Sequence, residues 1–299
     1  MDHESTWSGL PGKQVLLTGA TSGIGLAAAK AMAGRGAHVA LVARDRARGE
    51  AAAAAVRQAA ASAGEQPRVE LFLADLSVQA EVRQLADEVR RRLPALHVLV
   101  NNAGAVYSRR HVTADGLEAT WALNHVAPWL LTDLLLERLR ASAPARVITT
   151  SSDAGLLAQL PFDDLEARGW GQRGSVWQGF RRYGQSKLAN VAFTVELARR
   201  LDGSGVEAFC FHPGLVATNF NMSNGRLARS SMVALKPFAR SPEKGAETLL
   251  WLADSPKVRG LSGGYFADCR ARSIPRGARG DAPARLWAVT EQQVGRLIA

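Results

Sequence analysis

The sequence predicts an α/β fold, a doubly wound parallel sheet with helices on both faces. Short apolar, β-branched segments alternate with longer Ala-rich segments along the chain of 299 residues. The short segments are almost continuously hydrophobic, which is typical of strands buried on both faces. A glycine-rich loop joins the first short segment to the first long one. Alternating strands and helices favour right-handed crossovers, and therefore a parallel sheet.

The individual elements follow from the same alternation. The expected strands are Gln14–Leu17, His38–Ala43, Arg68–Leu73, Val98–Val100, Arg146–Thr150 and Glu207–Phe211, with a further candidate at the sheet edge, Gly264–Ala267. The expected helices are 23–35, 45–63, 78–92, 115–141 and 183–201. Period-2 and period-3.6 patterns separate the two kinds of segment.

We find no internal repeat and no linker, so residues 1–299 are expected to form a single domain with a core at 12–218. The segments 153–182 and 219–245 interrupt the strand–helix rhythm. Both follow predicted strand ends, where ligands bind in such sheets. We therefore expect them to be a substrate-side insertion and a lid.

Composition excludes several classes of protein. No apolar run approaches the roughly 20 residues that span a bilayer, and the start of the chain, with Asp2 and Glu4, does not resemble a secretory signal. The two cysteines, Cys210 and Cys269, fit a reduced cytoplasmic protein, and no Cys/His cluster has metal-ligand spacing. We expect a cytoplasmic protein with no membrane span and no metal.

The net charge of +10, from 37 basic and 27 acidic residues, raises the question of a nucleic-acid partner. Such proteins gather Lys and Arg on one helix or stripe, often beside aromatic residues. This chain has no basic helix with interleaved aromatics and no nucleic-acid motif. We therefore expect no nucleic-acid partner.

The loop between the first strand and first helix has the features of a phosphate site. Gly19, Gly23 and Gly25 permit a tight turn and a close backbone approach, and Thr21, Ser22 and Ile24 lie between them. A helix N-terminus supplies free N–H groups and a positive dipole end. A glycine-rich loop can also be a simple turn, but its position between strand and helix favours nucleotide binding.

Tyr183 and Lys187 stand four residues apart, about one helical turn, so both side chains lie on one face of a helix. An ammonium beside a phenol favours the phenolate and lowers the pKa of the phenol from about 10. Such a phenol can act as a general acid or base in carbonyl reduction. The same spacing also occurs by chance.

These motifs together resemble the short-chain dehydrogenase/reductase family over about residues 11–218. They are Thr18–Gly25, Asp75-Leu76, Asn101–Gly104, Asn124, Ser151-Ser152, Tyr183 with Lys187, and Pro213-Gly214 with Thr218. The segments Asn124–Thr132 and His212–Thr218 are most similar to the retinol dehydrogenase-like branch. From the first residues of this sequence we expect no membrane-anchoring segment of the kind usual in that branch. The resemblance implies a Rossmann-like fold and an NAD(P)-dependent interconversion of carbonyl and alcohol.

The resemblance also implies the cofactor contacts. The acidic residue that binds the ribose of NAD aligns with Ala43, and Arg44 follows it. An arginine pairs well with a 2′-phosphate, so NADP(H) is expected rather than NAD(H). Asp75 corresponds to the family residue at the adenine amine. Further cofactor contacts are expected from Gly19, Thr21, Ser22, Gly23, Ile24, Gly25, Leu76, Asn101, Ala103, Gly104, Tyr183, Lys187, Pro213, Gly214, Val216 and Thr218.

In the implied catalytic set Ser152 binds the substrate carbonyl oxygen, Tyr183 delivers the proton, and Lys187 holds the nicotinamide ribose and keeps the phenol acidic. Asn124 is implied to organise a water-mediated proton path to Lys187. Neighbouring strand residues point to opposite faces, so only one of the two serines can face the substrate, and Ser151 remains the alternative to Ser152.

The aromatic residues Trp170, Trp177 and Phe180 suggest a bulky, apolar carbonyl or alcohol substrate; equally, these rings can pack the insertion onto the sheet. A homodimer or homotetramer through the helices at 115–141 and 183–201 is possible on the family pattern. The alternative to an enzyme is a non-catalytic NADP(H)-binding sensor or scaffold on the same fold.

Overall fold

Strand β1 (Gln14–Thr18) lies inside an eight-stranded sheet of order β3-β2-β1-β4-β5-β6-β7-β8. The structure is a computed structural model, and it describes residues 7–170, 175–216 and 239–295. β1 pairs in parallel with β2 on one side and with β4 on the other. The carboxyl end of β1 is therefore the topological switch point, where ligands bind in folds of this kind.

The other strands are β2 (His38–Ala43), β3 (Val69–Leu73), β4 (Val98–Asn101), β5 (Ala145–Thr150), β6 (Val206–Phe211), β7 (Tyr265–Ala267) and β8 (Arg270–Arg272). Strands β1 to β7 pair in parallel, and β8 pairs antiparallel with β7. Every predicted strand is present with ends shifted by at most one residue. Only the short edge strand β8, whose residues are all exposed, was not expected.

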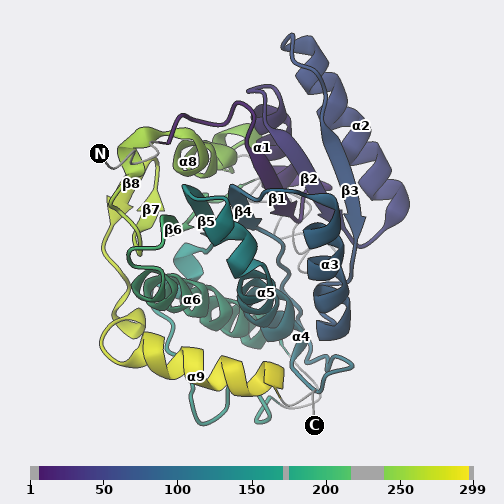
Figure 1. The fold of residues 1–299 in the computed structure, drawn as a ribbon. Helices are drawn as coiled ribbons and strands as arrows, with labels where there is room; N and C mark the ends of the chain where they lie inside the picture. The colour runs from purple at the N-terminus through teal and green to yellow at the C-terminus, as the bar shows by residue number, and fades with distance from the viewer. Residues whose placement is uncertain (1–6, 171–174, 217–238, 296–299) are drawn as a thin grey trace.

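The helices are α1 (Gly23–Ala33), α2 (Arg46–Ser62), α3 (Gln79–Arg92), α4 (Ala119–Trp121), α5 (Ala127–Ala141), α6 (Val176–Arg200), α8 (Pro242–Asp254) and α9 (Ala282–Gly295). In Figure 1, α1, α2 and α8 cover one face of the sheet, and α3, α5 and α6 cover the other. The predicted doubly wound architecture is thus confirmed. Helices α8 and α9 were not predicted.

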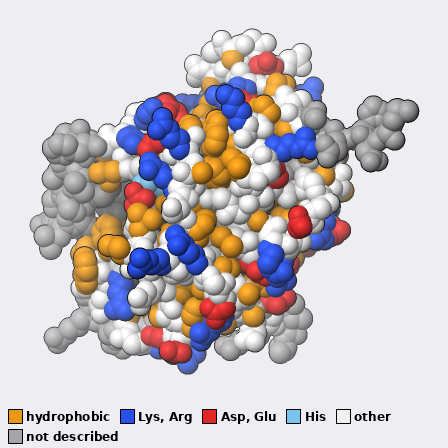
Figure 2. Space-filling view, turned by 90° about the vertical axis from the view of Figure 1, so that its left-hand side faces the viewer, with side chains coloured by type: hydrophobic (Ala, Val, Ile, Leu, Met, Phe, Trp, Pro, Cys, Tyr) orange, Lys and Arg blue, Asp and Glu red, His pale blue; other side chains and the backbone are white. Residues whose placement is uncertain are grey.

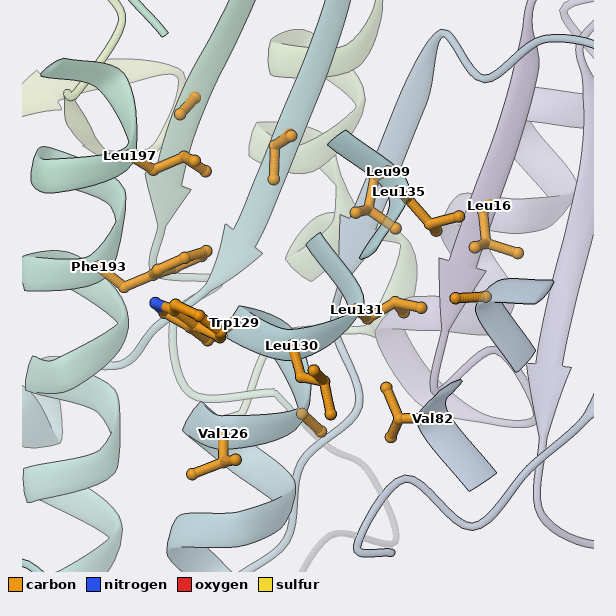
Figure 3. Packing of buried hydrophobic residues seen from close by; sticks show 14 of the residues in the cluster. Leu16, Val82, Leu99, Val126, Trp129, Leu130, Leu131, Leu135, Phe193 and Leu197 are labelled. Carbon is orange, nitrogen blue, oxygen red and sulfur yellow. The ribbon is translucent and has the colours of Figure 1, made fainter. Parts of the chain in front are cut away.

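The alternation of side chains along the central strands builds a separate core on each face of the sheet. Leu16 and Leu99 pack on the side of α3, α5 and α6, together with Trp129 and Phe193 (Figure 3). Val15 packs in the other cluster, with residues of α1 and α8. Each such side chain contributes about 1.5–3 kcal/mol to stability when it is buried. The two cores therefore hold in place the sheet edge that carries the site.

Helix α9 adds a layer outside α6. Its Trp287 stacks on Phe193 at 5.9 Å between ring centroids and meets Trp129 edge-on at 5.1 Å. Helices α5 and α6 are those through which a dimer was expected, so α9 covers part of that surface. The oligomeric state stays a prediction.

Three expected segments differ from the structure. The helix predicted over 115–141 is interrupted by a π-helical turn at Ala122–Val126. Helix α6 begins at Val176, because Ser175 caps it by accepting a hydrogen bond from Gln178 N at 3.1 Å; the end of the expected insertion 153–182 is therefore helical. Residues 242–245 of the expected lid are the first turn of α8, and residues 217–238 lie outside the described part.

Among the described residues, no helix is both long and apolar enough to cross a membrane. The same part of the chain contains no group of three His, Cys, Asp or Glu side chains placed to hold a metal ion. Figure 2 shows the face of the molecule at the β8 edge of the sheet. There the Lys and Arg side chains are spread among acidic and hydrophobic ones and do not form one continuous basic patch.

Candidate active site

The loop between β1 and α1 brings backbone to backbone at the switch point. Gly19 has φ +68° and Gly23 has φ +54°, conformations that favour glycine. A Cβ on Gly19 would lie 2.8 Å from Ala103 Cα, and one on Gly25 would collide with the carbonyl oxygen of Gly19. Ser22 does not cap α1 with its side chain. The first turn of α1 is thus built to receive an anionic group on its N–H groups.

The ends of β1, β4 and β5 are tied together beside this loop. Thr18 Oγ1 accepts hydrogen bonds from the backbone N–H groups of Asn102 at 2.9 Å and Ala103 at 3.0 Å. The Asn102 amide donates to the carbonyls of Thr18 and Gly19, at 3.1 and 3.2 Å. Asn101 Nδ2 instead donates to Thr132 Oγ1 at 3.0 Å, and its side chain is buried. The Asn-Asn-Ala-Gly segment therefore braces the phosphate loop.

Two arginines lie beside the loop at the end of β2. Arg44 Nη1 is 3.7 Å from Asp75 Oδ2, and the Arg44 side chain is 71% exposed. Arg48 Nη2 donates to Thr21 Oγ1 at 3.4 Å. Asp45 accepts a hydrogen bond from Arg48 N at 2.8 Å and so caps α2. Leu76 follows Asp75 and packs against the core. Residue 43, at the end of β2, is an alanine, so this position carries no carboxylate.

Ser152, Tyr183 and Lys187 meet at the carboxyl edge of the sheet. The side chains of Ser152 and Tyr183 are hydrogen-bonded to each other. Lys187 Nζ lies 5.6 Å from the centroid of the Tyr183 ring and donates to the carbonyl of Thr150 at 2.9 Å. The predicted one-face arrangement of Tyr183 and Lys187 is thus present on α6, with Ser152 opposite it after β5.

The pKa of Tyr183 differs from the sequence expectation. Burial raises the pKa of this half-buried phenol to about 12, and the hydrogen bond with Ser152 acts in the opposite direction. Burial lowers the pKa of Lys187 to about 8. The pKa of Tyr183 is thus raised and not lowered as expected, because burial removes water from around the ring.

The two neighbouring serines have different surroundings. Ser151 is buried, and its hydroxyl donates to the carbonyl of Lys187 at 2.7 Å. Ser152 is half-buried, and its Oγ accepts a hydrogen bond from Ala154 N at 3.2 Å. Ser151 thus joins β5 to α6, whereas Ser152 faces Tyr183.

Asn124 lies in the π-helical turn and is fully buried. Its Nδ2 donates to Ala105 O at 2.9 Å and to Ser186 Oγ at 3.0 Å, and its Oδ1 accepts from Ala105 N at 2.8 Å. π-helical turns occur frequently at functional sites. A Cβ on Gly104 would lie 3.2 Å from Asn124 Oδ1 and 3.4 Å from Lys187 Nζ, so these three residues lie close against one another.

The turn after β6 approaches the phosphate loop from the other side. Gly214 has φ +85°. Val216 is buried, and a Cβ on Gly245 of α8 would lie 3.2 Å from both Val216 Cγ1 and Ile24 Cγ1. Pro213 opens this turn, next to the paired His212 and Asp153 side chains, 2.9 Å apart. Thr218 lies outside the described residues.

The aromatic residues of the expected pocket wall separate into two groups. Trp170 is buried, whereas Trp177 is 80% exposed and Phe180 is partly exposed. The packing interpretation therefore applies to Trp170. Trp177 and Phe180 remain available at the start of α6, with the exposed Leu157 on the preceding segment.

Sequence reasoning did not find the ion pair between Arg182 and Glu118. Arg182 Nε lies 2.8 Å from Glu118 Oε2, and both side chains are buried. Arg182 is therefore neither solvated nor available to an anionic substrate. The only sequence signal is the period of α6, which places residue 182 on the buried side together with Ser186 and Ala189.

The comparisons with known proteins agree with this geometry. The family model described as short chain dehydrogenase matches residues 13–162. Human retinol dehydrogenase 12 is 39% identical over 292 residues, covering 96% of this chain and 87% of the relative. The candidate daunorubicin C-13 ketoreductase DnrU of Streptomyces is 41% identical over 295 residues, covering 98% and 96%.

Solved structures show the same architecture. A protein from Mycobacterium paratuberculosis superposes with TM-score 0.73 at 31% identity, covering 96% of this chain and 95% of the other. A short-chain dehydrogenase from Burkholderia cenocepacia in complex with NADP gives TM-score 0.65 at 25% identity, covering 91% and 99%. With its retinol dehydrogenase and ketoreductase relatives, the chain belongs to the short-chain dehydrogenase/reductase family of oxidoreductases.

Proposed function

We propose that the chain is an NADP(H)-dependent oxidoreductase that interconverts a ketone or aldehyde with the corresponding alcohol, with Tyr183 as the general acid/base. The observation that carries the proposal is the meeting of Ser152, Tyr183 and Lys187 beside the phosphate loop. The nicotinamide cofactor supplies or accepts the hydride. The chain's own residues supply orientation and the proton.

Ser152 and Tyr183 have complementary parts in this mechanism. The Ser152 hydroxyl donates to the substrate oxygen, where negative charge develops during reduction. The pKa of Tyr183, raised to about 12 by burial, keeps its phenol protonated at neutral pH and ready to donate. Lys187, with a pKa lowered to about 8 by burial, is the next ionisable group along α6 and replaces the proton that leaves Tyr183.

Asn124 is proposed to serve the proton path indirectly. Its three hydrogen bonds are to Ala105 and Ser186. Its Oδ1 lies beside Gly104, and so does the Lys187 ammonium. A side chain so held can position a water molecule beside Lys187. Lys187 Nζ donates to Thr150 O. The same ammonium must also donate to the cofactor ribose.

The preference for NADP(H) rests on the end of β2. A 2′-phosphate bound there would meet the exposed guanidinium of Arg44, with Arg48 four residues further on. Ala43 places no carboxylate against the phosphate. Gly19, Gly23 and Gly25 would hold the pyrophosphate, and Asp75 and Leu76 the adenine. The ribose and nicotinamide end would be held by Asn101, Ala103, Gly104, Pro213, Gly214, Val216 and Thr218.

We propose a bulky, apolar substrate. Trp177, Phe180 and Leu157 leave large apolar side chains exposed on the segments next to Tyr183, and apolar walls suit ligands of this kind. The names of the two curated relatives refer to retinol and daunorubicin. Both are large hydrophobic molecules, which supports the same class here.

The experiment is NADPH oxidation with a panel of carbonyl compounds: all-trans-retinal, an anthracycline ketone and a small ketone as control. Tyr183→Phe, which removes only the hydroxyl, should lower kcat by at least about 100-fold while NADPH still binds. Arg44→Ala should weaken NADPH binding by about tenfold or more and leave NADH nearly unchanged. Equal losses for both cofactors would contradict the 2′-phosphate assignment.

A non-catalytic NADP(H)-binding sensor or scaffold remains the alternative function. It predicts tight NADPH binding with no compound in the panel distinguishing the wild type from Tyr183→Phe. The presence of Ser152, Lys187 and Asn124 together around Tyr183 favours the enzyme.

A further inference from the structure

A buried ion pair lies immediately beside the proposed catalytic tyrosine. Arg182 precedes Tyr183 on α6, its side chain is 2% exposed, and that of Glu118 is 0% exposed. Their closest atoms, Nε and Oε2, are 2.8 Å apart. Two charges withdrawn from water cost free energy that their attraction often only offsets. Such a pair is weak evidence for a role in stability alone, and the segments that it joins are informative.

Glu118 links the pair to the π-helical turn. Its Oε1 accepts from Thr120 N at 2.8 Å and its Oε2 from Trp121 N at 3.0 Å, so the carboxylate caps α4. Helix α4 continues without a break into the turn that carries Asn124. The guanidinium of Arg182 also lies over the Trp121 ring, 4.6 Å from its centroid.

Arg182 links the pair to the substrate-side segment. Its Nη2 donates to the backbone carbonyl of Leu165, a buried residue between β5 and α6. Its Nη1 donates to Gln185 Oε1 at 3.4 Å. One side chain therefore contacts α4, the segment 153–170 and its own helix. The planar fork of an arginine holds several acceptors in fixed directions, whereas the three donors of a lysine sit on one freely rotating ammonium.

We propose that Arg182 and Glu118 form a buried clamp that sets the position of Tyr183 relative to the π-helical turn and the segment 153–170. In this role Arg182 is a positioning residue and does not touch substrate or cofactor. The inference rests on the proposed function for its effect on catalysis. The clamp itself concerns how three segments are held.

The clamp predicts more than a stability effect. The hydroxyl of Tyr183 must meet the substrate oxygen, and a displacement of about 1 Å costs about 100-fold in rate. A pair that serves only stability predicts that removing both charges together restores the enzyme, because no unpaired charge remains buried. The two readings therefore separate in a double variant.

The test compares the wild type with Arg182→Met combined with Glu118→Gln, which removes both charges and keeps an oxygen to cap α4. We expect kcat to fall by about 10- to 100-fold. The NADPH affinity should stay within about threefold, because the phosphate loop is distant in sequence and does not contact the ion pair. Amide hydrogen exchange should become faster in 153–170 and in 118–126. Arg199→Met, which removes an exposed guanidinium paired with Glu196 on the same helix, is the matched control and should change neither quantity.

Arg182→Lys provides a second route if the double variant does not fold. It keeps the positive charge opposite Glu118 but loses the fork, so exchange in 153–170 should rise and kcat should fall in the same direction. A change in kcat without faster exchange overturns the clamp, and so does faster exchange with wild-type kcat. If the wild type turns over none of the carbonyl panel, the proposed function fails, and unchanged exchange in the variants then overturns the clamp separately.

Discussion

The choice between Ser151 and Ser152 is open to a direct test, because the two serines are adjacent and each is replaced by alanine with the loss of one hydroxyl. Ser151 Oγ donates to Lys187 O at 2.7 Å, inside the protein. Ser152 Oγ is hydrogen-bonded to Tyr183 and accepts from Ala154 N at 3.2 Å. Ser151→Ala therefore removes a structural contact, whereas Ser152→Ala removes the proposed contact with the substrate oxygen.

The magnitudes follow from these contacts. Ser151→Ala loses one intramolecular hydrogen bond and Ser152→Ala loses two, at about 0.5–1.5 kcal/mol each in the free energy of unfolding. With an unfolding entropy of about 2.1 cal/mol/K per residue, a chain of 299 residues changes its Tm by about 2 °C per kcal/mol. The Tm should thus fall by about 1–3 °C in Ser151→Ala and by about 2–6 °C in Ser152→Ala. Removing a donor to a developing oxyanion lowers kcat by about 10²–10³-fold, and only Ser152→Ala should show this.

The assay measures steady-state NADPH oxidation with the best carbonyl substrate, beside the Tm and the NADPH affinity of each variant. Because both variants should lose only a few °C in Tm, Ser151→Ala controls for any general effect of removing a hydroxyl at this strand end. A 100-fold loss of kcat in Ser151→Ala with near-normal activity in Ser152→Ala would refute the assignment. It would show that the register at the end of β5 is not the one described.

Three further predictions follow from single contacts. Gly25→Ala should abolish NADPH binding in a fluorescence titration, because its Cβ would collide with the Gly19 carbonyl oxygen; retained affinity would contradict the tight loop. In the cofactor-free protein the phenolate of Tyr183, isolated as the ultraviolet difference from Tyr183→Phe, should be absent at pH 8, because burial raises its pKa to about 12. Its protonated form stabilises the fold below pH 10, a contribution lost as the pH rises toward 12. Trp287→Ala should lower the free energy of unfolding by about 3–5 kcal/mol in urea titrations, as expected for a buried aromatic side chain; a loss below about 1 kcal/mol would show that α9 is not packed as described.

Local patterns were sufficient for much of the fold. The strands could be predicted because a segment buried on both faces of a sheet must be almost continuously apolar, as in His38–Ala43. Helices α8 and α9 were missed, although the buried residues Ala246, Leu249, Leu250 and Ala253 of α8 recur at helical spacing. The break in the helix over 115–141 has no local signal: Asn124 is held there by Ala105 and Ser186, which are distant in sequence.

The sequence alone determined the class of fold, the phosphate loop and the membership of Tyr183 and Lys187 in one helical face, because each depends on residue types at short spacing. The tertiary structure decided what surrounds them. Burial raises the pKa of Tyr183 that proximity to Lys187 was expected to lower, and Arg182 pairs with Glu118 inside the protein. Desolvation and long-range pairing depend on segments far apart in the chain, so no local pattern contains them.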